Sequence, residues 1–474
     1  MDVNALAETL RRSVGDDGVL TAAQVGERSA GTFRSDRLKA PLLVRPRAVA
    51  EVSAVLRACH QARAPVVTHG GLTGLVHGAD AGADEIILSL ERLRAIEEIN
   101  PVDRTAVVQA GVTVQAIQEA AEAAGLMFPL DLGARGSATL GGTIATNAGG
   151  NRVVRYGMMR DMVLGLEAVL ADGTIVSNLS RIIKNNTGYD LRHLFIGSEG
   201  TLGVVTRATL RLRERPASRD VAFAATRDFG GLVKLLKHMD HALGGRLSAF
   251  EVMWQSHYDL VTQPPAKSSP PLARGYPYYV LVESLGADPE RDGETFLSAL
   301  DGAHRQEIIA DAAIAQSRAE GDAMWAIRDD VGQLRRFPSM QVFDISLPLS
   351  AIEGYVEKLL RHVAARWPHA HCFIFGHLGD GNLHVAVGSE DAVAGSIEAD
   401  ALCAMVYQPL ASLGGSVSAE HGIGLEKKSW LYVSRSADEI AVMRSIKEAL
   451  DPLYLLNPGK IFDIPATRHR EAAA

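Results

Sequence analysis

Cysteine is scarce in this sequence of 474 residues. The three cysteines, Cys59, Cys372 and Cys403, are odd in number and lie far apart in the chain. Neither a disulfide framework nor a paired-cysteine metal site fits that distribution. Because thiols stay reduced inside cells, we expect a cytoplasmic protein.

Long apolar runs are also missing. Residues 1–20 contain Arg11 and Arg12 and lack the apolar core of a signal peptide. No later stretch stays apolar over the roughly 20 residues that a membrane-spanning helix needs, so we expect no membrane span. Basic residues are not in excess, because 48 Lys and Arg residues stand against 56 Asp and Glu residues. The formal net charge of -8 argues against a dedicated nucleic-acid-binding protein, which needs clustered basic side chains.

Two common nucleotide-binding motifs are absent as well. The chain has no GxxxxGK(S/T) loop, and no GxGxxG follows a predicted strand. These absences weaken the case for an ATP-dependent or NAD-dependent enzyme.

Glycine is abundant instead. Many of the 45 glycines fall in four clusters: His69–Gly78, Gly133–Gly150, Gly188–Gly203 and Gly376–Gly381. Glycine lets the backbone approach a ligand closely and adopt a positive φ. Tight turns alone are the simpler explanation of a single cluster. Four clusters between predicted strands and helices favour loops that surround a large ligand.

The apolar pattern of the first half predicts an α+β fold with antiparallel pieces. Helices are predicted at 49–59 and 114–124, the second ending at Gly125, and strands at 64–68, 85–90, 105–110 and 206–212. Asp172-Gly173 lies between two further apolar runs, 164–170 and 174–177, and both residues tolerate the positive φ of a hairpin turn. We therefore expect a β-hairpin there.

A chain of this length is expected to form two or three domains. A polar, proline-containing stretch at 214–218 marks a boundary, and 263–277 is predicted as a surface loop. The second domain is predicted to be an antiparallel sheet covered by helices, with strands at 278–283 and 341–346 and helices at 351–366 and 392–413.

Several motifs of the first half follow one another in a consistent order. Pro65 to Gly74 is predicted as a strand that runs into a glycine turn, and backbone N–H groups in such a turn can surround a pyrophosphate. The motifs at 129–150, 184–191 and 197–206 come next. Together they resemble the FAD-binding oxidase superfamily typified by vanillyl-alcohol oxidase, over residues 38–215.

The resemblance implies a two-subdomain FAD-binding domain that holds FAD between two α+β subdomains. It assigns the pyrophosphate to Gly70, Gly71, Leu72, Thr73 and Gly74, the flavin and its phosphates to Ser137, Thr139, Gly142, Thr143 and Asn147, and the adenine side to Gly203 and Val205. Pro129 and Asn457 belong to motifs expected to contact the same cofactor. Leu72 stands where some relatives carry a histidine that attaches FAD covalently, so we expect non-covalent FAD.

A pair of histidines in the last glycine cluster is a candidate metal site. His377 and His384 would point to opposite faces of one straight strand. Asp380-Gly381, however, predicts a two-residue hairpin turn that places the two histidines directly opposite each other, with Cβ atoms about 5 Å apart. From the hairpin alone, a surface pair or a hydrogen-bonded core pair is the better explanation. Glu420, in the motif Ser418–Gly424, offers a third ligand, and two histidines with one carboxylate suit a catalytic metal.

These two motifs, with Leu456–Lys460 near the end, resemble the D-2-hydroxyacid dehydrogenases of the D-lactate, D-2-hydroxyglutarate and glycolate types. The resemblance now covers nearly the whole chain. It implies a divalent metal, zinc in most members, bound by His377, His384 and Glu420. It also implies that His421 is the catalytic base and that Arg328 anchors the substrate carboxylate. From its position alone, Arg328 would be an ordinary arginine on a helix surface.

The expected reaction is oxidation of a small D-2-hydroxy acid to the 2-oxo acid. A metal that binds the hydroxyl group lowers its pKa, and a histidine can accept the released proton near neutral pH. The predicted domains are an N-terminal helical segment at 1–37, the FAD-binding domain at 38–215, a substrate (cap) domain at 216–425, a C-terminal segment returning to the FAD domain at 426–465, and a tail at 466–474.

Three positions set the expected substrate. Gly332, Val342 and Ala386 stand where the 2-hydroxyglutarate type carries polar side chains. A dicarboxylate needs polar groups at its far end, so we expect D-lactate or another small or apolar 2-hydroxy acid, with D-2-hydroxyglutarate as the alternative.

Other functions remain open at this level. An oxidase would pass electrons to oxygen, and a dehydrogenase would pass them to an electron-transfer flavoprotein, a cytochrome or a quinone. A metal-dependent hydrolase would use His377, His384 and Glu420 but leaves the glycine-rich first half unexplained. The motifs of the second half fit an alkyl-glycerone-phosphate synthase less well, and the presence of Arg328 and His421 argues against an inactive flavin-binding subunit. A homodimer is compatible with the sequence.

Overall fold

In the computed structural model, the chain divides into two compact units. The first unit contains Met1–Gly150, Gly157–Arg215 and Glu420–Ala474, and the second contains Asn151–Tyr156 and Pro216–Ala419. The structure describes residues 2–31, 34, 36–390 and 397–464. The expected tail at 466–474 lies outside the described residues, as do 392–396 of a predicted helix. The second unit ends at Ala419 rather than at residue 425, and it includes Asn151–Tyr156, which the sequence did not indicate.

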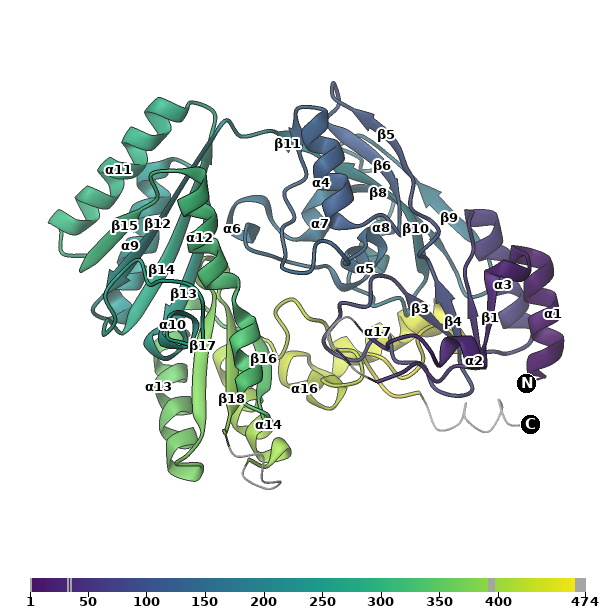
Figure 1. Ribbon diagram of the computed structural model, residues 1–474. Coiled ribbons are helices and arrows are strands. Elements are labelled where there is room, and N and C mark those ends of the chain that lie inside the picture. Colours follow the sequence, from purple (N-terminus) through teal and green to yellow (C-terminus); the bar gives the residue numbers. More distant parts are fainter. Residues whose placement is uncertain (1, 32–33, 35, 391–396, 465–474) are drawn as a thin grey trace. The chain divides into compact units, whose positions relative to one another are not determined.

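The first sheet of the first unit has four strands in the order β1-β2-β4-β3, and Figure 1 labels β1, β3 and β4 of this sheet. Its strands are β1 (Val19–Thr21), β2 (Leu42–Val44), β3 (Val66–His69) and β4 (Ile86–Ser89). Strand β4 pairs in parallel with β2 and β3, whereas β1 is antiparallel to β2. The strands predicted at 64–68 and 85–90 are therefore confirmed, with shifted ends.

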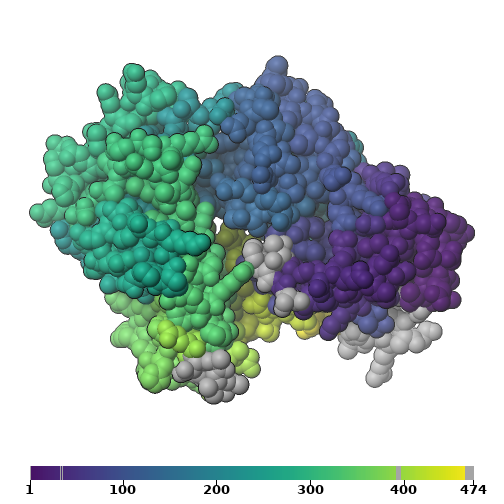
Figure 2. Space-filling model, viewed as in Figure 1, coloured from purple at the N-terminus to yellow at the C-terminus, as the bar shows by residue number. Residues whose placement is uncertain are grey.

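Helices α1 (Val3–Val14) and α3 (Val49–Gln61) pack on this sheet. Asp2 caps the start of α1, where its side chain accepts the N–H groups of Asn4 and Ala5. Leu10 of α1 and Leu56 of α3 are buried in one core with the strands. Figure 2 shows the purple N-terminal residues in a continuous surface with the rest of this unit.

The second sheet of the first unit is antiparallel, in the order β5-β6-β10-β8-β9. Its strands are β5 (Ile96–Asn100), β6 (Thr105–Gln109), β8 (Val163–Val169), β9 (Ile175–Asn178) and β10 (Val204–Arg211). The predicted hairpin is confirmed: Asp172 accepts the N–H of Thr174, and Gly173 has a φ of 86°. Helix α4 (Val114–Ala123) begins after the capping residue Thr113 and ends before Gly125, at a φ of 75°, as predicted.

The remaining elements of the first unit are short except for the last helix. They are η1 (Asp16–Gly18), α2 (Ala22–Val25), β7 (Leu126–Met127), α5 (Leu140–Thr146), α7 (Met159–Met162), α8 (Arg192–Phe195), β11 (Arg213–Glu214), η4 (Lys428–Trp430), α16 (Leu431–Ser434) and α17 (Ala437–Leu450).

The second unit is built on one antiparallel sheet of seven strands, in the order β15-β12-β14-β13-β17-β18-β16. The strands are β12 (Ser218–Thr226), β13 (Leu247–Trp254), β14 (Tyr278–Gly286), β15 (Asp311–Ile314), β16 (Gln341–Ser346), β17 (His371–His377) and β18 (Asn382–Gly388). The sheet confirms the strands predicted at 278–283 and 341–346, and the segment 263–277 is a loop without helix or strand. The predicted α+β class therefore holds in both units.

Helices cover the seven-stranded sheet. They are α6 (Val153–Tyr156), α9 (Phe229–Leu243), α10 (Gln255–Thr262), α11 (Pro289–Arg305), α12 (Arg318–Asp329), η2 (Val331–Arg336), α13 (Leu349–Arg366), η3 (Leu378–Asp380), α14 (Ala399–Tyr407) and α15 (Leu410–Leu413). Helices α10 and α12 share one apolar core with the sheet, which contains Tyr258, Trp325 and Phe375. The helix predicted at 392–413 is interrupted at Pro409, which cannot donate a helical hydrogen bond. No helix in the described ranges is long and apolar enough to cross a membrane.

Candidate active site

The strand pair β17–β18 carries both histidines of the predicted metal hairpin, but in a different register. His384 lies opposite Phe375, not opposite His377. The predicted two-residue turn is wrong because Leu378–Asp380 form a 3-10 turn with a buried Leu378, and Asp380 accepts the N–H of Asn382. The register differs by two residues, and side chains alternate with a period of two, so both histidines stay on one face. Their ring centroids lie 5.5 Å apart.

His377 belongs to a buried cluster of charged side chains. Its Nδ1 lies 2.7 Å from Oε1 of Glu251, the residue directly across from it on β13. Arg328, from α12, donates through Nε to Oε2 of Glu251 at 2.7 Å and lies with Nη2 3.3 Å from Nε2 of His377. Nδ1 of His377 therefore faces the Glu251 carboxylate, and Nε2 faces the guanidinium of Arg328.

Burial raises the pKa of Glu251, but His377 and Arg328 lower it, and the net shift is downward. The carboxylate therefore stays ionised inside the sheet. It fixes the guanidinium of Arg328, which is 8% exposed. Arg328 is therefore not the ordinary helix-surface arginine that was the alternative to a carboxylate anchor.

Asp344 is a site residue that the sequence did not single out. It lies on β16 directly opposite His384, with Oδ1 3.9 Å from Nδ1 of that ring. Asn382 donates to Oδ1 at 2.9 Å, and the backbone N–H of Ala419 donates to Oδ2 at 3.0 Å. This fully buried carboxylate thus holds the start of the Ser418–Gly424 motif against the sheet edge. The signal that could have found it is its place in the Phe343-Asp344 pair of a predicted strand.

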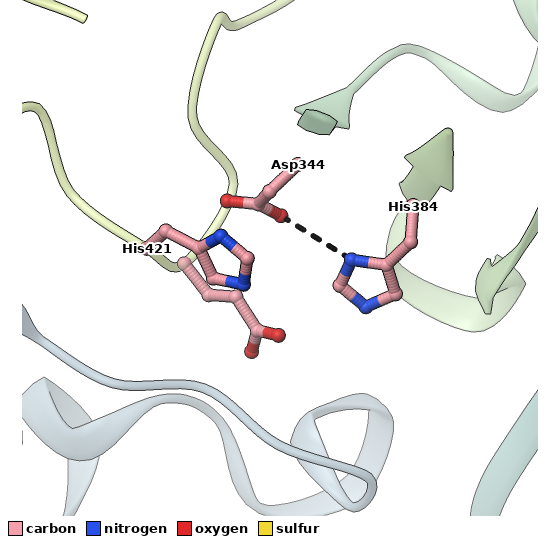
Figure 3. Close-up of side chains that lie close together, drawn as sticks. Asp344, His384 and His421 are labelled. Atoms are coloured by element: carbon pink, nitrogen blue, oxygen red, sulfur yellow. Dashed lines mark ion pairs between the residues drawn. The ribbon is translucent and has the colours of Figure 1, made fainter. Parts of the chain in front are cut away.

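Four side chains of the types that bind metal come together at this point. One ligand atom each from Asp344, His384, Glu420 and His421 lies within 4.8 Å of the others (Figure 3). Glu420 and His421 directly follow Ala419, which Asp344 binds. The structure therefore brings together two of the three predicted ligands and the predicted base. His377 is not a member of this cluster.

The first unit brings the two predicted phosphate-binding segments into contact. A Cβ atom on Gly71 would lie 1.9 Å from the carbonyl oxygen of Ser137, and one on Gly70 would lie 2.6 Å from Oγ1 of Thr139. The backbones are thus as close as only glycine allows. The hydroxyl groups of Thr68 and Thr139 are buried there, and no group in the described part of the chain forms a hydrogen bond with them.

Asn457, from the C-terminal segment, joins two of the predicted cofactor loops. Its Oδ1 accepts the N–H of Thr68 at 2.8 Å, and its Nδ2 donates to the carbonyl of Glu199 at 2.6 Å. Asn457 itself has a φ of 42°, and Leu72 has a φ of 54°. Left-handed backbone at non-glycine residues is uncommon and gathers at ligand sites.

The other predicted cofactor residues lie in the same unit. Asn147 ends α5 in the left-handed region and accepts the N–H of Arg160. Pro129, Thr143 and Val205 are buried. Gly203 packs closely against Phe195, and an added Cβ at this glycine would lie 2.7 Å from the phenylalanine ring. Of the remaining members, Thr73, Gly74 and Ser137 lie in the two glycine-rich loops, and Gly142 lies in α5.

These features fit FAD. Because Gly70 and Gly71 have no side chains, a ligand at this contact would meet their backbone. The hydroxyl groups of Thr68 and Thr139 could form hydrogen bonds with it. His69 is buried, and its Nε2 lies 2.8 Å from the carbonyl oxygen of Ala79.

Two family descriptions match different parts of the chain. Residues 40–178 match the family described as FAD binding domain, and residues 215–461 match FAD linked oxidases, C-terminal domain. The D-2-hydroxyglutarate dehydrogenase of Xanthomonas citri pv. viticola is 40% identical over 421 residues, which cover 88% of each chain. The D-2-hydroxyglutarate dehydrogenase of Stutzerimonas stutzeri is 34% identical over 470 residues, covering 97% of this chain and 99% of that one.

This chain belongs to the FAD-linked D-2-hydroxyacid dehydrogenase family.

The mitochondrial D-2-hydroxyglutarate dehydrogenase of Bos taurus, another member, is 40% identical and covers 90% of this chain and 78% of its own. Solved structures show the fold of the dehydrogenase at lower identity. A 4-ethylphenol oxidase from Gulosibacter chungangensis has a TM-score of 0.74 at 17% identity, covering 98% of both chains. p-Cresol methylhydroxylase has a TM-score of 0.75 at 16% identity, covering 97% of both. The expected fold of the vanillyl-alcohol oxidase type is thereby confirmed.

Proposed function

We propose that this dehydrogenase oxidises D-2-hydroxyglutarate to the 2-oxo acid with non-covalent FAD and a divalent metal, zinc in the first instance. The observation that carries the proposal is the juxtaposition of Asp344, His384, Glu420 and His421, with the buried Arg328 on the same unit as His384. A carboxylate anchor, metal-type ligands and a base are the groups that this oxidation requires.

Arg328 is proposed to bind the substrate carboxylate. Glu251 holds the guanidinium through Nε, so the orientation of its planar fork is set before substrate arrives. The fork can then form paired hydrogen bonds to a carboxylate. Lysine in this place would give one charge without that geometry.

His421 is proposed to accept the proton of the substrate hydroxyl group. Asp344 supports this role, because it fixes the N–H of Ala419, two residues before His421. His384 and Glu420 are proposed metal ligands, and the metal would supply a Lewis acid for the hydroxyl oxygen. Asp344 adds a carboxylate beside His384, a partner that orients ligand histidines in many metal sites. His377 stays a prediction as a ligand, since its nitrogens face Glu251 and Arg328.

FAD is proposed to lie against the paired glycine loops, where it would supply the hydride acceptor. Gly70, Gly71 and the hydroxyl group of Thr139 would contact it. Non-covalent attachment is favoured because Leu72 cannot bond to the flavin and Nε2 of His69 already contacts the carbonyl of Ala79.

The two candidate substrates differ in the side chain of the 2-hydroxy acid. The names of the relatives favour D-2-hydroxyglutarate over the D-lactate that we expected from Gly332, Val342 and Ala386. D-Lactate remains a second candidate, because Ala386 is fully buried in an apolar core and Gly332 has no side chain. We further propose an electron-transfer flavoprotein, a cytochrome or a quinone as acceptor, rather than oxygen.

The test is anaerobic reduction of the flavin by matched acids. Purified protein is mixed with D-2-hydroxyglutarate, L-2-hydroxyglutarate and D-lactate, with and without a chelator, and the flavin absorbance is followed. We expect rapid bleaching by D-2-hydroxyglutarate, loss of bleaching after chelation, and recovery with zinc. Bleaching by D-lactate alone would replace the substrate, and no bleaching by any acid would overturn the proposed function. Reoxidation faster by an acceptor dye than by oxygen would support a dehydrogenase.

A further inference from the structure

Glu199, in the Gly188–Gly203 cluster, contacts the loop that carries the proposed base. Its Oε1 accepts the N–H of Ile423 and its Oε2 accepts the N–H of Gly424, both at 2.7 Å. The carboxylate is buried. The nearer of the two amides that it binds, at Ile423, lies three residues after Glu420 and two residues after His421. Each oxygen thus satisfies a different backbone donor of one short turn.

Glu199 is itself fixed in the first unit. Its N–H donates to the carbonyl of Ala145 at 2.7 Å, and its own carbonyl accepts Nδ2 of Asn457 at 2.6 Å. It also has a φ of 52°, in the left-handed region. A non-glycine residue in that region costs conformational energy and persists only when its surroundings fix it. Backbone and side chain are therefore both held.

Gly422 shows how close the contact is. This glycine lies between His421 and Ile423 with a φ of 87°, and a Cβ atom there would lie 2.9 Å from Oε1 of Glu199. Any side chain at 422 would be strained and would push the carboxylate away. The position after His421 therefore requires glycine as long as the Glu199 carboxylate keeps its place.

We propose that Glu199 is a positioning residue that sets the direction of the His421 side chain. The proposal rests on the proposed function, in which His421 is the base. Two hydrogen bonds at Ile423 and Gly424 fix the turn, and the turn fixes the backbone from which His421 projects. A misplacement of about 1 Å at a reacting group can cost on the order of 100-fold in rate. The same contact joins a loop predicted to bind FAD to the loop that acts on the substrate.

The variant Glu199→Gln tests this role with little change in size. Its amide keeps one acceptor oxygen but presents an NH₂ group to the second N–H, so one of the two bonds is lost. We expect the limiting rate of anaerobic flavin reduction to fall about 10- to 100-fold, with little change in substrate KM. The pH midpoint of that rate should also move, because the base sits in a changed position. Glu199→Asp, which keeps the charge but shortens the reach, should restore part of the rate.

A matched control is Asp292→Asn in the second unit. Asp292 is also a buried carboxylate that accepts a backbone N–H, from Asp288 at 2.9 Å, and a hydroxyl group, from Ser218 at 2.7 Å. Its replacement should lower the melting temperature but leave the limiting rate and its pH profile unchanged. Gly422→Ala is an independent probe that keeps Glu199 and should reproduce the kinetic change of Glu199→Gln.

Hydrogen exchange gives a readout apart from activity. Backbone amides of a peptide spanning 422–425 should exchange faster in Glu199→Gln than in the wild type. If both Glu199→Gln and Gly422→Ala lower the melting temperature but keep the wild-type rate and pH profile, Glu199 is only structural and the inference fails. If Glu199→Gln fails to fold, Glu199→Asp and Gly422→Ala decide. Failure of the proposed function would appear in the wild type, as absence of reduction by any 2-hydroxy acid.

Discussion

The two units hold their predicted functional residues by different means. The first unit uses backbone: Gly70 and Gly71 bring two loops into a contact that no Cβ would permit. The second unit uses buried charge: Glu251, Arg328 and His377 form a network on adjacent strands and a helix. A glycine loop forms its close contact because glycine has no side chain, whereas a buried network of charges is stable only when every member has a partner. The two halves should therefore fail differently when altered.

The largest effect is expected from adding a side chain at the close backbone contact of the first unit. In Gly71→Ala the new Cβ would lie 1.9 Å from the carbonyl oxygen of Ser137, and backbone cannot move aside as a flexible side chain can. We expect the purified protein to contain almost no flavin. Its free energy of unfolding should fall by more than the roughly 1–3 kcal/mol that ordinary overpacking costs, and its melting temperature should fall with it. Flavin absorbance per protein measures the result.

Gly133→Ala is the control for this change, because an added Cβ at Gly133 meets nothing within 4 Å. It should retain flavin and stability. Full flavin content in Gly71→Ala would show that the loop contact is not needed for the cofactor, and the contrast between backbone and side-chain construction would lose its main support.

This difference also explains what could be predicted from the sequence. The glycine motifs, the strand at 341–346 and the hairpin at Asp172-Gly173 are local patterns, so a few adjacent residues were enough to identify them. The partners of His377 were missed because Glu251 lies 126 residues away, and only the β13–β17 register makes them neighbours. Asp344 was missed for the same reason. Register depends on packing across the whole sheet, and a turn of unexpected length displaces it by whole residues.

The next effect in size concerns the charged network of the second unit. Arg328→Met leaves the Glu251 carboxylate buried without its arginine partner. Removing one member of a buried ion pair costs about 3–5 kcal/mol, and we expect a loss of that order in the free energy of unfolding, measured with urea. Substrate affinity should fall as well. The double variant Glu251→Gln with Arg328→Met should recover part of the stability, because no charge is then left alone.

Arg305→Met is the control for the network. Arg305 pairs with Asp301 on the exposed surface of α11, where an ion pair contributes little. Its removal should leave stability nearly unchanged. If Arg328→Met costs no more than Arg305→Met, the network carries no stability and its only role would be in binding.

The smallest effect at neutral pH is expected at His257 of α10. Its ring stacks on Phe375 at a centroid distance of 4.0 Å, and neither ring nitrogen has a hydrogen-bond partner among the described residues. Burial, with smaller contributions from Arg328 and His384, lowers the pKa of His257 to about 3. An unsatisfied buried polar group costs about 1–3 kcal/mol, so His257→Leu should be neutral or stabilising at pH 7.

The pH dependence gives the sharper test. The folded pKa of His257 lies below the unfolded value of about 6.5, so the unfolded chain takes up the proton first. The stability that comes from this difference is present above about pH 6.5 and is lost as the pH falls toward 3, by up to about 1.4 kcal/mol per pH unit. His257→Leu should flatten that loss. His69, whose pKa burial lowers to about 4, contacts the carbonyl of Ala79 through Nε2, so His69→Leu should cost stability at pH 7. If His257→Leu destabilises as much as His69→Leu at pH 7, His257 has a partner such as a buried water, and its ring is not an unsatisfied polar group of the second unit.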